Sequence, residues 1–403
     1  MSRRSVLSTF GIRPVGQASA AGMVTFLLRQ AEIRRARARR NLRKSADGRY
    51  DTRIVNREGL VMDGNAARML VVGPSWVGDM VMAQSLFTDL CRRHPGVEID
   101  VLSPVWSGPV LARMPEVHRH IDMPVGHGRI GLIERVRLGL SLRSRQYGQA
   151  IVIPRSFKSA LVPFFAGIPR RTGFRGEMRY GLLNDLRNLD RDVLPRTVQR
   201  YVALGRSPDA ALPPADIPRP RLRVDVTNQQ HLLQRFSLSL DRPVVGFMPG
   251  AEYGAAKRWP AAYYAELAGM LRGRGYQVWL FGSARDAAVC REINDASVEA
   301  VDLSGKTGLQ DAIDLIALTK LVVTNDSGLM HIAAATGRNI VALYGSSTPA
   351  YTPPLTDRAD IVYLGLECSP CFERECPLGH YRCLRNITPA DVFDRCIRKV
   401  QEH

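Results

Sequence analysis

The sequence has no hydrophobic run long enough to cross a bilayer, although 45% of its 403 residues are hydrophobic. A membrane-spanning helix needs about 20 consecutive apolar residues. The longest candidate, SALVPFFAGIP at 159–169, is shorter and contains two prolines. The first residues lack an apolar core with a cleavage site, and the seven cysteines do not form a secreted-type disulfide pattern. We therefore expect a cytoplasmic protein, and the length favours two domains over one.

Acidic residues are scarce in the first part of the chain, and the net charge is +18. Residues 1–65 hold 14 basic and 5 acidic residues, residues 66–240 hold 25 and 14, and residues 241–403 hold 17 and 19. The excess of positive charge therefore lies in the first two segments. It favours an anionic partner such as a nucleic acid, an anionic lipid or a phosphorylated substrate. The simpler alternative is that the positive charge serves only to keep the protein soluble.

The first 65 residues differ from the rest. The stretch RQAEIRRARARRNLRK at 29–44 suits a basic helix on an anionic membrane. Met62 precedes the first predicted strand closely, and Met69 lies within it. We interpret residues 1–65 as a basic extension that is disordered or that stems from a misassigned start.

Beyond residue 66, short apolar runs alternate with longer amphipathic stretches, as in parallel βαβ units. The predicted strands are 68–73, 97–104, 149–154, 244–250, 276–282, 321–326 and 340–345. The predicted helices are 80–93, 227–238, 260–273, 285–296, 309–319 and 328–336. A proline-rich stretch at 207–224 interrupts the alternation. The pattern predicts two doubly wound α/β domains, 66–240 and 241–403, with a ligand between them at the carboxyl ends of the strands.

Three strand ends in the second half suit a nucleotide diphosphate. In TNDSGLMHIAAATG, at 324–337, Asp326 or Ser327 can cap a helix that starts near Gly328, and His331 lies one turn later. A helix N-terminus attracts phosphate through its N–H groups and dipole. An ordinary capped helix with a satisfied histidine is the alternative.

The other two strand ends supply charge and open loops. MPGAEYGAAKRWP, at 248–260, contains Gly250 and also Lys257, which we expect at the phosphates unless it is simply solvated. LFGSARD, at 280–286, places three residues where a ribose or base is expected: Gly282, Ser283 and Asp286. No Walker A sequence is present, and no G-x-G-x-x-G follows the first strand of either domain, which argues against a standard dinucleotide site.

One acid stands at the mouth of the first strand-to-helix turn. GPSWVGDMVMAQSL, at 73–86, contains Gly78 and Asp79. Aspartate is a favoured helix N-cap. It is also a suitable general base where a hydroxyl must lose its proton. The sequence alone leaves both roles open.

These segments together resemble those of the glycosyltransferase family that includes the lipopolysaccharide heptosyltransferases. The resemblance covers roughly residues 68–400 and implies a two-domain GT-B fold with an ADP-heptose donor on the second domain. It implies a heptosyl-Kdo-lipid A acceptor on the first domain and transfer with inversion at the anomeric carbon, with no cofactor required. In this interpretation Asp79 is the base, while Lys257 and the helix start at 326–328 stabilise the departing ADP.

The basic first domain fits such an acceptor, which carries phosphates and carboxylates in an anionic membrane leaflet. The stretch 153–181 contains four candidate acceptor contacts besides Gly78: Arg155, Lys158, Arg175 and Arg179. A solvated basic face is the alternative. We expect a peripheral enzyme at the inner face of the inner membrane. The rivals are another GT-B sugar-nucleotide transferase or epimerase, and a basic nucleic-acid-binding protein, whose recognition motifs are absent.

Four cysteines lie close together near the C-terminus, ahead of a final predicted helix. Cys368, Cys371, Cys376 and Cys383 follow the spacing C-x2-C-x4-C-x6-C, with His380 inside the motif. Four thiolates suit a structural zinc site or an iron–sulfur cluster. A reduced cluster without metal is the alternative, because the spacing matches no common zinc pattern.

Overall fold

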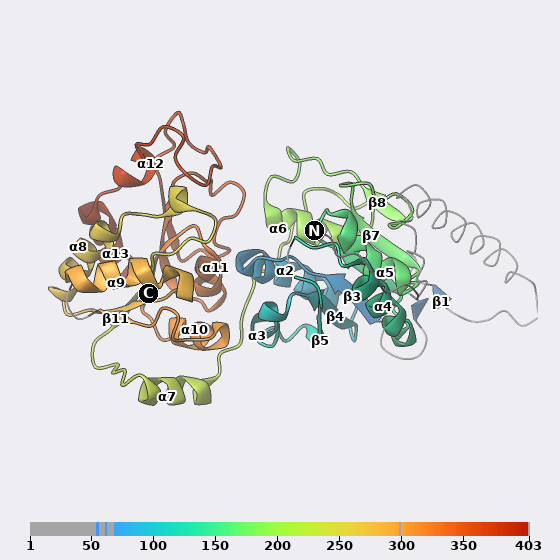
Figure 1. The fold of residues 1–403 in the computed structure, drawn as a ribbon, viewed down its shortest axis with the longest axis horizontal. Helices are drawn as coiled ribbons and strands as arrows, with labels where there is room; N and C mark the ends of the chain where they lie inside the picture. Colours follow the sequence, from blue (N-terminus) through green and yellow to red (C-terminus); the bar gives the residue numbers. More distant parts are fainter. Residues whose placement is uncertain (1–53, 56–60, 63–67, 127, 298–299, 402–403) are drawn as a thin grey trace, which may run out of the picture. The chain divides into compact units, whose positions relative to one another are not determined.

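Two six-stranded parallel sheets organise the chain (Figure 1). The computed structural model describes residues 54–55, 61–62, 68–126, 128–297 and 300–401. Most of the predicted basic extension, including the helix expected at 29–44, lies outside the described residues. Within it only a short antiparallel pair is described, formed by β1 (Ile54–Val55) and β2 (Val61–Met62).

The first sheet has the order β5-β4-β3-β6-β7-β8, with all its strands parallel. Its strands are β3 (Arg68–Val72), β4 (Glu98–Ser103), β5 (Val117–Asp122), β6 (Gln149–Val152), β7 (Arg170–Phe174) and β8 (Asp185–Arg187). In the centre, Val71 of β3 is in register with Val101 and Ile151. These central positions are apolar because helices cover both faces of a parallel sheet.

The second sheet repeats this order as β11-β10-β9-β12-β13-β14, again fully parallel. Its strands are β9 (Val244–Met248), β10 (Gln277–Leu280), β11 (Val301–Asp302), β12 (Leu321–Asn325), β13 (Asn339–Tyr344) and β14 (Ala359–Tyr363). Counted along the chain, both sheets have the order 3-2-1-4-5-6. Successive strands are therefore added in opposite directions across the sheet on either side of the β3–β6 pair and of the β9–β12 pair. Open α/β sheets bind ligands at such switch points.

Helices connect and cover the strands (Figure 1). Those of the first half are α2 (Val77–Arg93), α3 (Gly108–Leu111), α4 (Leu132–Ser141), α5 (Leu161–Phe165) and α6 (Thr197–Gly205). Those of the second are α7 (Val226–Arg235), α8 (Ala261–Arg272), α9 (Ala287–Ser297), α10 (Leu309–Ile316), α11 (Gly328–Ala335), α12 (Arg382–Arg385) and α13 (Pro389–Gln401). None of these described helices has both the length and the hydropathy of a membrane span.

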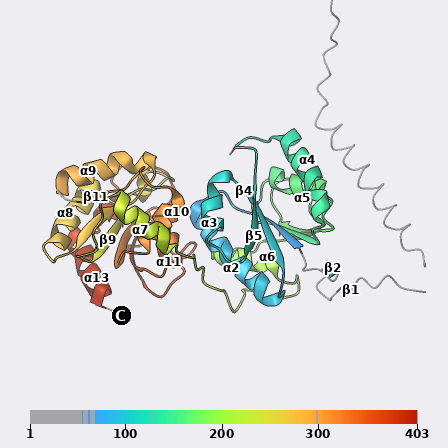
Figure 2. The same cartoon turned by 90° about the horizontal axis from the view of Figure 1, so that it is seen from below.

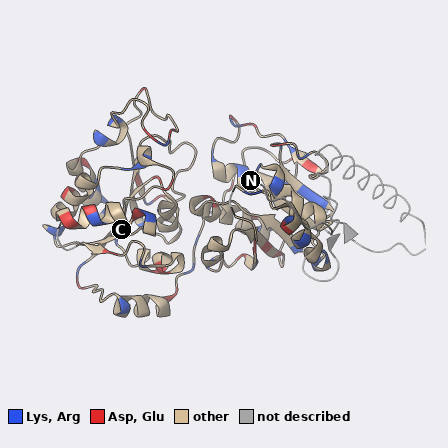
Figure 3. Ribbon diagram, viewed as in Figure 1, with Lys and Arg blue, Asp and Glu red and all other residues tan. Residues whose placement is uncertain are grey.

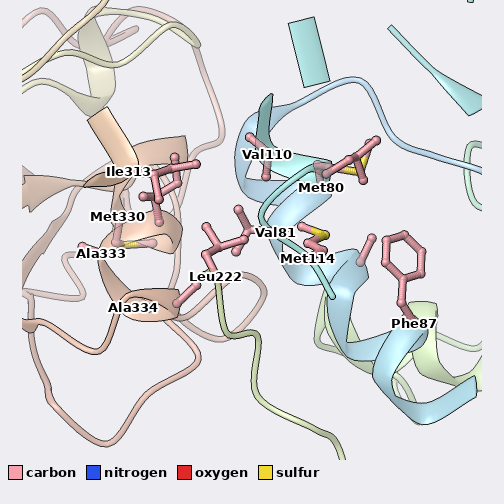
Figure 4. Packing of buried hydrophobic residues seen from close by; sticks show 14 of the residues in the cluster. Met80, Val81, Phe87, Val110, Met114, Leu222, Ile313, Met330, Ala333 and Ala334 are labelled. Carbon is pink, nitrogen blue, oxygen red and sulfur yellow. The ribbon is translucent and has the colours of Figure 1, made fainter. Parts of the chain in front are cut away.

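The connection between the sheets is held at several points. Leu222 is buried in one apolar cluster with Val81 of α2 and Ala334 of α11, and its N–H donates to the Ala335 carbonyl at 3.0 Å (Figure 4). Further along, α7 lies against α10 (Figure 2), where Asn228 donates to the Asp314 carboxylate at 2.8 Å. Residues 54–403 accordingly form one compact unit. The domain boundary near residue 240 stays a prediction.

The predicted fold class is confirmed, and the strands and helices expected beyond residue 66 are all present. Five strands of the two sheets were not predicted: β5, β7, β8, β11 and β14. The sequence of β5, VHRHID, alternates with charged and histidine residues because it is an edge strand. β8 and β11 are only three and two residues long, too short for an apolar pattern.

Candidate functional site

A cavity of about 460 Å³ lies where the two switch points meet. Loops after β3 line it from the first sheet, and loops after β9, β10 and β12 line it from the second. The structure brings to its wall Gly78 and Asp79 and all nine predicted donor residues: Gly250, Lys257, Gly282, Ser283, Asp286, Asp326, Ser327, Gly328 and His331. The volume falls in the usual range for a small-ligand site.

Asp79 is the third residue of α2 and is not its N-cap. Trp76 occupies the N-cap position in extended backbone, and no side chain caps the helix. The Asp79 carboxylate instead accepts a hydrogen bond from the Tyr201 hydroxyl of α6. Burial raises the pKa of Asp79 from 3.8 to about 6, opposed by the Tyr201 hydrogen bond; nearby Asp326 raises it further and Lys257 lowers it. Asp79 therefore does not act as the N-cap of α2. Its carboxylate, which is ionised near neutral pH, faces the cavity.

Lys257 and Asp326 form an ion pair on the opposite side of the cavity. Lys257 Nζ lies 2.5 Å from Asp326 Oδ2, and Ser347 Oγ donates to the same oxygen at 2.6 Å. The Tyr253 ring lies 5.1 Å from Lys257 Nζ. The ammonium group is thereby held at the cavity wall.

Asn325 fixes the loop that carries Lys257. The Asn325 side chain is fully buried at the end of β12 and donates to the Pro249 carbonyl at 2.7 Å. Its Oδ1 accepts the Trp259 N–H at 3.1 Å and the Tyr264 hydroxyl at 3.3 Å. One amide therefore links both ends of the 249–259 loop to the strand that precedes Asp326.

The N-terminus of α11 opens into the cavity next to the N-terminus of α2. Ser327 is its N-cap residue but makes no side-chain cap hydrogen bond, so its side chain leaves the first-turn N–H groups to a ligand. A Cβ on Gly78 would lie 2.6 Å from His331 Cδ2, and one on Gly328 would lie 2.8 Å from Val77 Cβ. Both glycines are thus required for the close approach of the two helices. Burial lowers the pKa of His331 to about 4, so the ring is neutral at pH 7.

Asp286 closes the far end of the cavity. It accepts hydrogen bonds from the Ser283 N–H at 2.9 Å and the Ser283 hydroxyl at 2.7 Å. A Cβ on Gly250 would lie 2.3 Å from this carboxylate, and a Cβ on Gly282 would lie 2.8 Å from Asp286 Cβ. The two glycines make room for Asp286, which presents a carboxylate suited to ribose hydroxyls.

The predicted acceptor-side cations lie outside the cavity wall. Arg155, Lys158 and Arg175 belong to the loops that follow β6 and β7; the two arginines are exposed and the lysine is half-buried. Basic positions are scattered over several helices, strands and loops (Figure 3). This distribution does not resemble a single nucleic-acid recognition helix.

Arg179 is 1% exposed, which contradicts its predicted direct contact with an acceptor. Its guanidinium donates to the Pro154 carbonyl at 2.6 Å, to Ser159 Oγ at 3.2 Å and to the Phe174 carbonyl. Burial lowers the pKa of Arg179 to about 10. The Arg179 side chain therefore links the loop that follows β6 to the end of β7.

The four cysteines of the cluster lie close together in space. The charges of Cys368, Cys371 and Cys376 add to burial in raising the pKa of Cys383. Among the residues that the structure describes, no group of three or more His, Cys, Asp or Glu side chains is placed to hold a metal ion. Cys376 Sγ accepts the Tyr381 N–H at 3.5 Å, and Cys383 packs against the apolar core of the second half. The zinc or iron–sulfur prediction is therefore unsupported.

Several residues that line the cavity or contact its lining residues were not predicted. Tyr201 reaches Asp79 from α6, and Thr352 lines the wall from a loop far along the chain. Met248 and Phe281 add apolar surface at the ends of their strands. The last two sit beside predicted glycines and could have been inferred from strand position, whereas Tyr201 has no local sequence signal.

Two sheets of this order around one cavity, with an acid after the first strand of one and a cation after the first strand of the other, define a GT-B-type fold. The sequence profile of glycosyltransferase family 9 (heptosyltransferase) matches residues 135–382. Lipopolysaccharide heptosyltransferase 2 of Escherichia coli K12 is 49% identical over 336 residues, which is 81% of this chain and 97% of that protein. Lipooligosaccharide heptosyltransferase 2 of Haemophilus influenzae is 53% identical, with the same coverage of both chains.

A solved structure agrees with these relatives. The structure of E. coli ADP-heptose lps heptosyltransferase II has a TM-score of 0.75 to this chain and 46% sequence identity, covering 83% of this chain and 99% of that one. The chain belongs to glycosyltransferase family 9, the heptosyltransferases, which confirms the predicted family. It is therefore a glycosyltransferase.

Proposed function

We propose that the protein transfers a heptose from ADP-heptose to the heptosylated Kdo-lipid A inner core, in lipopolysaccharide core biosynthesis. The family and the heptosyltransferase 2 relatives support the reaction class. The observation that carries the proposal is the placement of Asp79 and the Lys257–Asp326 pair on opposite walls of one cavity. The proposal includes peripheral contact with the cytoplasmic face of the inner membrane, where a lipid acceptor is anchored.

In the proposed reaction, the Asp79 carboxylate takes the proton of an acceptor hydroxyl. The hydroxyl oxygen then attacks the anomeric carbon of the heptose from the side opposite the diphosphate, and the bond between that carbon and the phosphate oxygen breaks. The proton stays on Asp79 and the electron pair leaves with ADP. Inversion follows because attack and departure occur on opposite faces.

The donor wall stabilises the departing diphosphate. Lys257 and the N–H groups at the start of α11 supply positive charge where negative charge develops. His331, next to Gly78, is neutral at pH 7 and can therefore form a hydrogen bond with a sugar hydroxyl without adding a charge to the site. Asp286 and Ser283 suit the ribose. None of these roles requires a cofactor.

We expect the purified protein to release ADP from ADP-heptose only when a singly heptosylated Kdo-lipid A acceptor is present. A product one heptose heavier by mass spectrometry completes the result. An acceptor that lacks the first heptose serves as the control for acceptor choice. If the nucleoside diphosphate of another sugar nucleotide is released instead, a different GT-B transferase activity is indicated.

Activity should fall in acid because the base must be ionised. With the pKa of Asp79 near 6, kcat/KM is expected to drop by about tenfold per pH unit below that value and to level off above it. Replacing Tyr201 with Phe removes a donor that stabilises the carboxylate, so the midpoint should move to higher pH. A profile that stays flat between pH 5 and 7 in both proteins would contradict the base assignment.

A further inference from the structure

Three loops of the first sheet form a continuous surface at its carboxyl edge. They follow β5, β6 and β7 and comprise residues 128–131, 155–158 and 175–180. We call this surface the loop rim. Because parallel strands end at a common edge, the loop rim lies on the same side of the sheet as the turn after β3 that carries Asp79.

Hydrogen bonds join the three loops. Lys158 Nζ donates to the Arg129 carbonyl at 3.3 Å, which links the first loop to the second. Arg155 Nε donates to the Arg175 carbonyl at 3.2 Å, and the Glu177 N–H donates to the Arg155 carbonyl at 3.2 Å. The loop rim therefore acts as one surface, and its side chains keep fixed neighbours.

Buried arginines hold the loop rim from beneath. Arg135 of α4 is 5% exposed and donates to the Ile130 carbonyl at 2.7 Å and to the Lys158 carbonyl at 3.4 Å. Arg179, which belongs to the third loop, supports the second loop in the same way, through the Ser156 carbonyl at 3.4 Å. Buried guanidinium groups committed to loop carbonyls indicate a surface whose shape is set before any partner binds.

Large apolar side chains project from this surface. The exposed fractions are 64% for Ile130, 80% for Met178 and 60% for Tyr180. Single exposed apolar residues are common and need no explanation. Here they stand on adjoining, hydrogen-bonded loops at the edge that also carries the acid of the site. Such grouping is typical of an interaction surface.

Positive charge surrounds these apolar tips. Arg129, Arg155 and Arg175 are exposed, and Lys158 is half-buried. Glu177 is the one acid of the loop rim, and its carboxylate already accepts the Phe157 N–H at 2.7 Å. Apolar tips among cations match the boundary of an anionic bilayer, where side chains enter the acyl region and cations meet headgroup phosphates.

We propose that the loop rim docks on an anionic lipid bilayer, inserting Ile130, Met178 and Tyr180 below the headgroups. Arg129, Arg155 and Arg175 then contact lipid phosphates. This proposal adds a membrane-docking surface to the proposed function. It rests on the proposed function in one respect only, namely that the acceptor is a lipid. Docked in this way, the protein presents the Asp79 edge of the sheet to sugars that rise from the membrane surface.

The test measures sedimentation of the full chain with vesicles of phosphatidylethanolamine and phosphatidylglycerol. The double variant Ile130→Asp/Met178→Asp is expected to bind about 100-fold more weakly, because two inserted side chains are each worth roughly tenfold. Val226, 62% exposed at the start of α7, gives the matched control Val226→Asp, which should bind like the wild type. Binding of the wild type should also weaken in phosphatidylcholine vesicles and at high salt.

Activity on two forms of the acceptor separates this inference from the proposed function. With acceptor embedded in vesicles the double variant should lose turnover, whereas with deacylated, water-soluble acceptor it should match the wild type. Unchanged vesicle binding by the double variant would overturn the docking proposal, as would equal loss of turnover on both acceptors. If the wild type releases no ADP with either acceptor, the proposed function fails, while the vesicle result still decides the docking surface.

Discussion

Asp79→Asn is expected to slow turnover by about 10²- to 10⁴-fold, the usual contribution of a general base. Asparagine keeps the size of the side chain and its hydrogen bond with Tyr201, but it cannot take the proton of the acceptor hydroxyl. The KM for ADP-heptose should change little, because the donor is held by the opposite wall. Steady-state ADP release with saturating acceptor measures the effect.

The same variant should not be less stable at neutral pH. The pKa of Asp79 is raised by burial in the folded chain, so its charge lowers stability once the pH rises from 3.8 through about 6. Removing the charge should leave the free energy of unfolding unchanged or increase it by up to about 3 kcal/mol above pH 6.

Asp89 on the same helix is the contrasting case. It is 4% exposed and lies 2.6 Å from Arg206 and 3.2 Å from Arg93, so Asp89→Asn should lower stability while folded molecules keep their turnover. A normal rate in Asp79→Asn would rule out the base role, and a large loss of stability there would restore a structural role for the acid.

Lys257→Met is expected to lower kcat by about 10²- to 10³-fold, because one preorganised positive group near the departing diphosphate is lost. Asp326 is then left in a buried site with Ser347 as its remaining close partner. Stability should therefore fall as well, by about 3 kcal/mol, since an uncompensated buried carboxylate is costly. Turnover and chemical denaturation together measure the two effects.

The double variant Lys257→Met/Asp326→Asn separates chemistry from stability. Neutralising both partners removes the unpaired charge, so the free energy of unfolding should recover while kcat stays low. Lys306→Met is the control, because its ammonium donates to the Asp302 carbonyl and Lys306 itself does not line the cavity. A Lys257→Met protein that is unstable but turns over normally would limit Lys257 to a structural role.

The donor side of the cavity was largely predictable from the sequence, because its residues follow strands whose apolar runs are unambiguous. Gly250, Gly282 and Asp326 each stand within a few residues of a strand end, and parallel topology brings those ends together. The sequence could not show that Asp286 fills the space which the two glycines leave open. That relation depends on side-chain packing across two loops.

The predicted acceptor contacts were less predictable, because burial decides which of these cations can reach a partner. Arg155 and Arg179 look alike in the sequence, yet one is exposed and the other is enclosed by carbonyl groups. Tyr201 lies 122 positions after Asp79 and reaches it only because α6 packs on α2. Such contacts join distant segments, and no local pattern encodes them.

In the proposed reaction, the repeated strand order of the two sheets places the two chemical tasks on different sheets. Asp79 and Lys257 follow the first strands of their sheets, β3 and β9, and so occupy equivalent positions in two copies of one topology. In the proposed reaction, loops of the first sheet could therefore change length or charge to suit a different acceptor without moving the groups proposed to hold the nucleotide. Acceptor choice and donor choice would then be alterable independently in this scaffold.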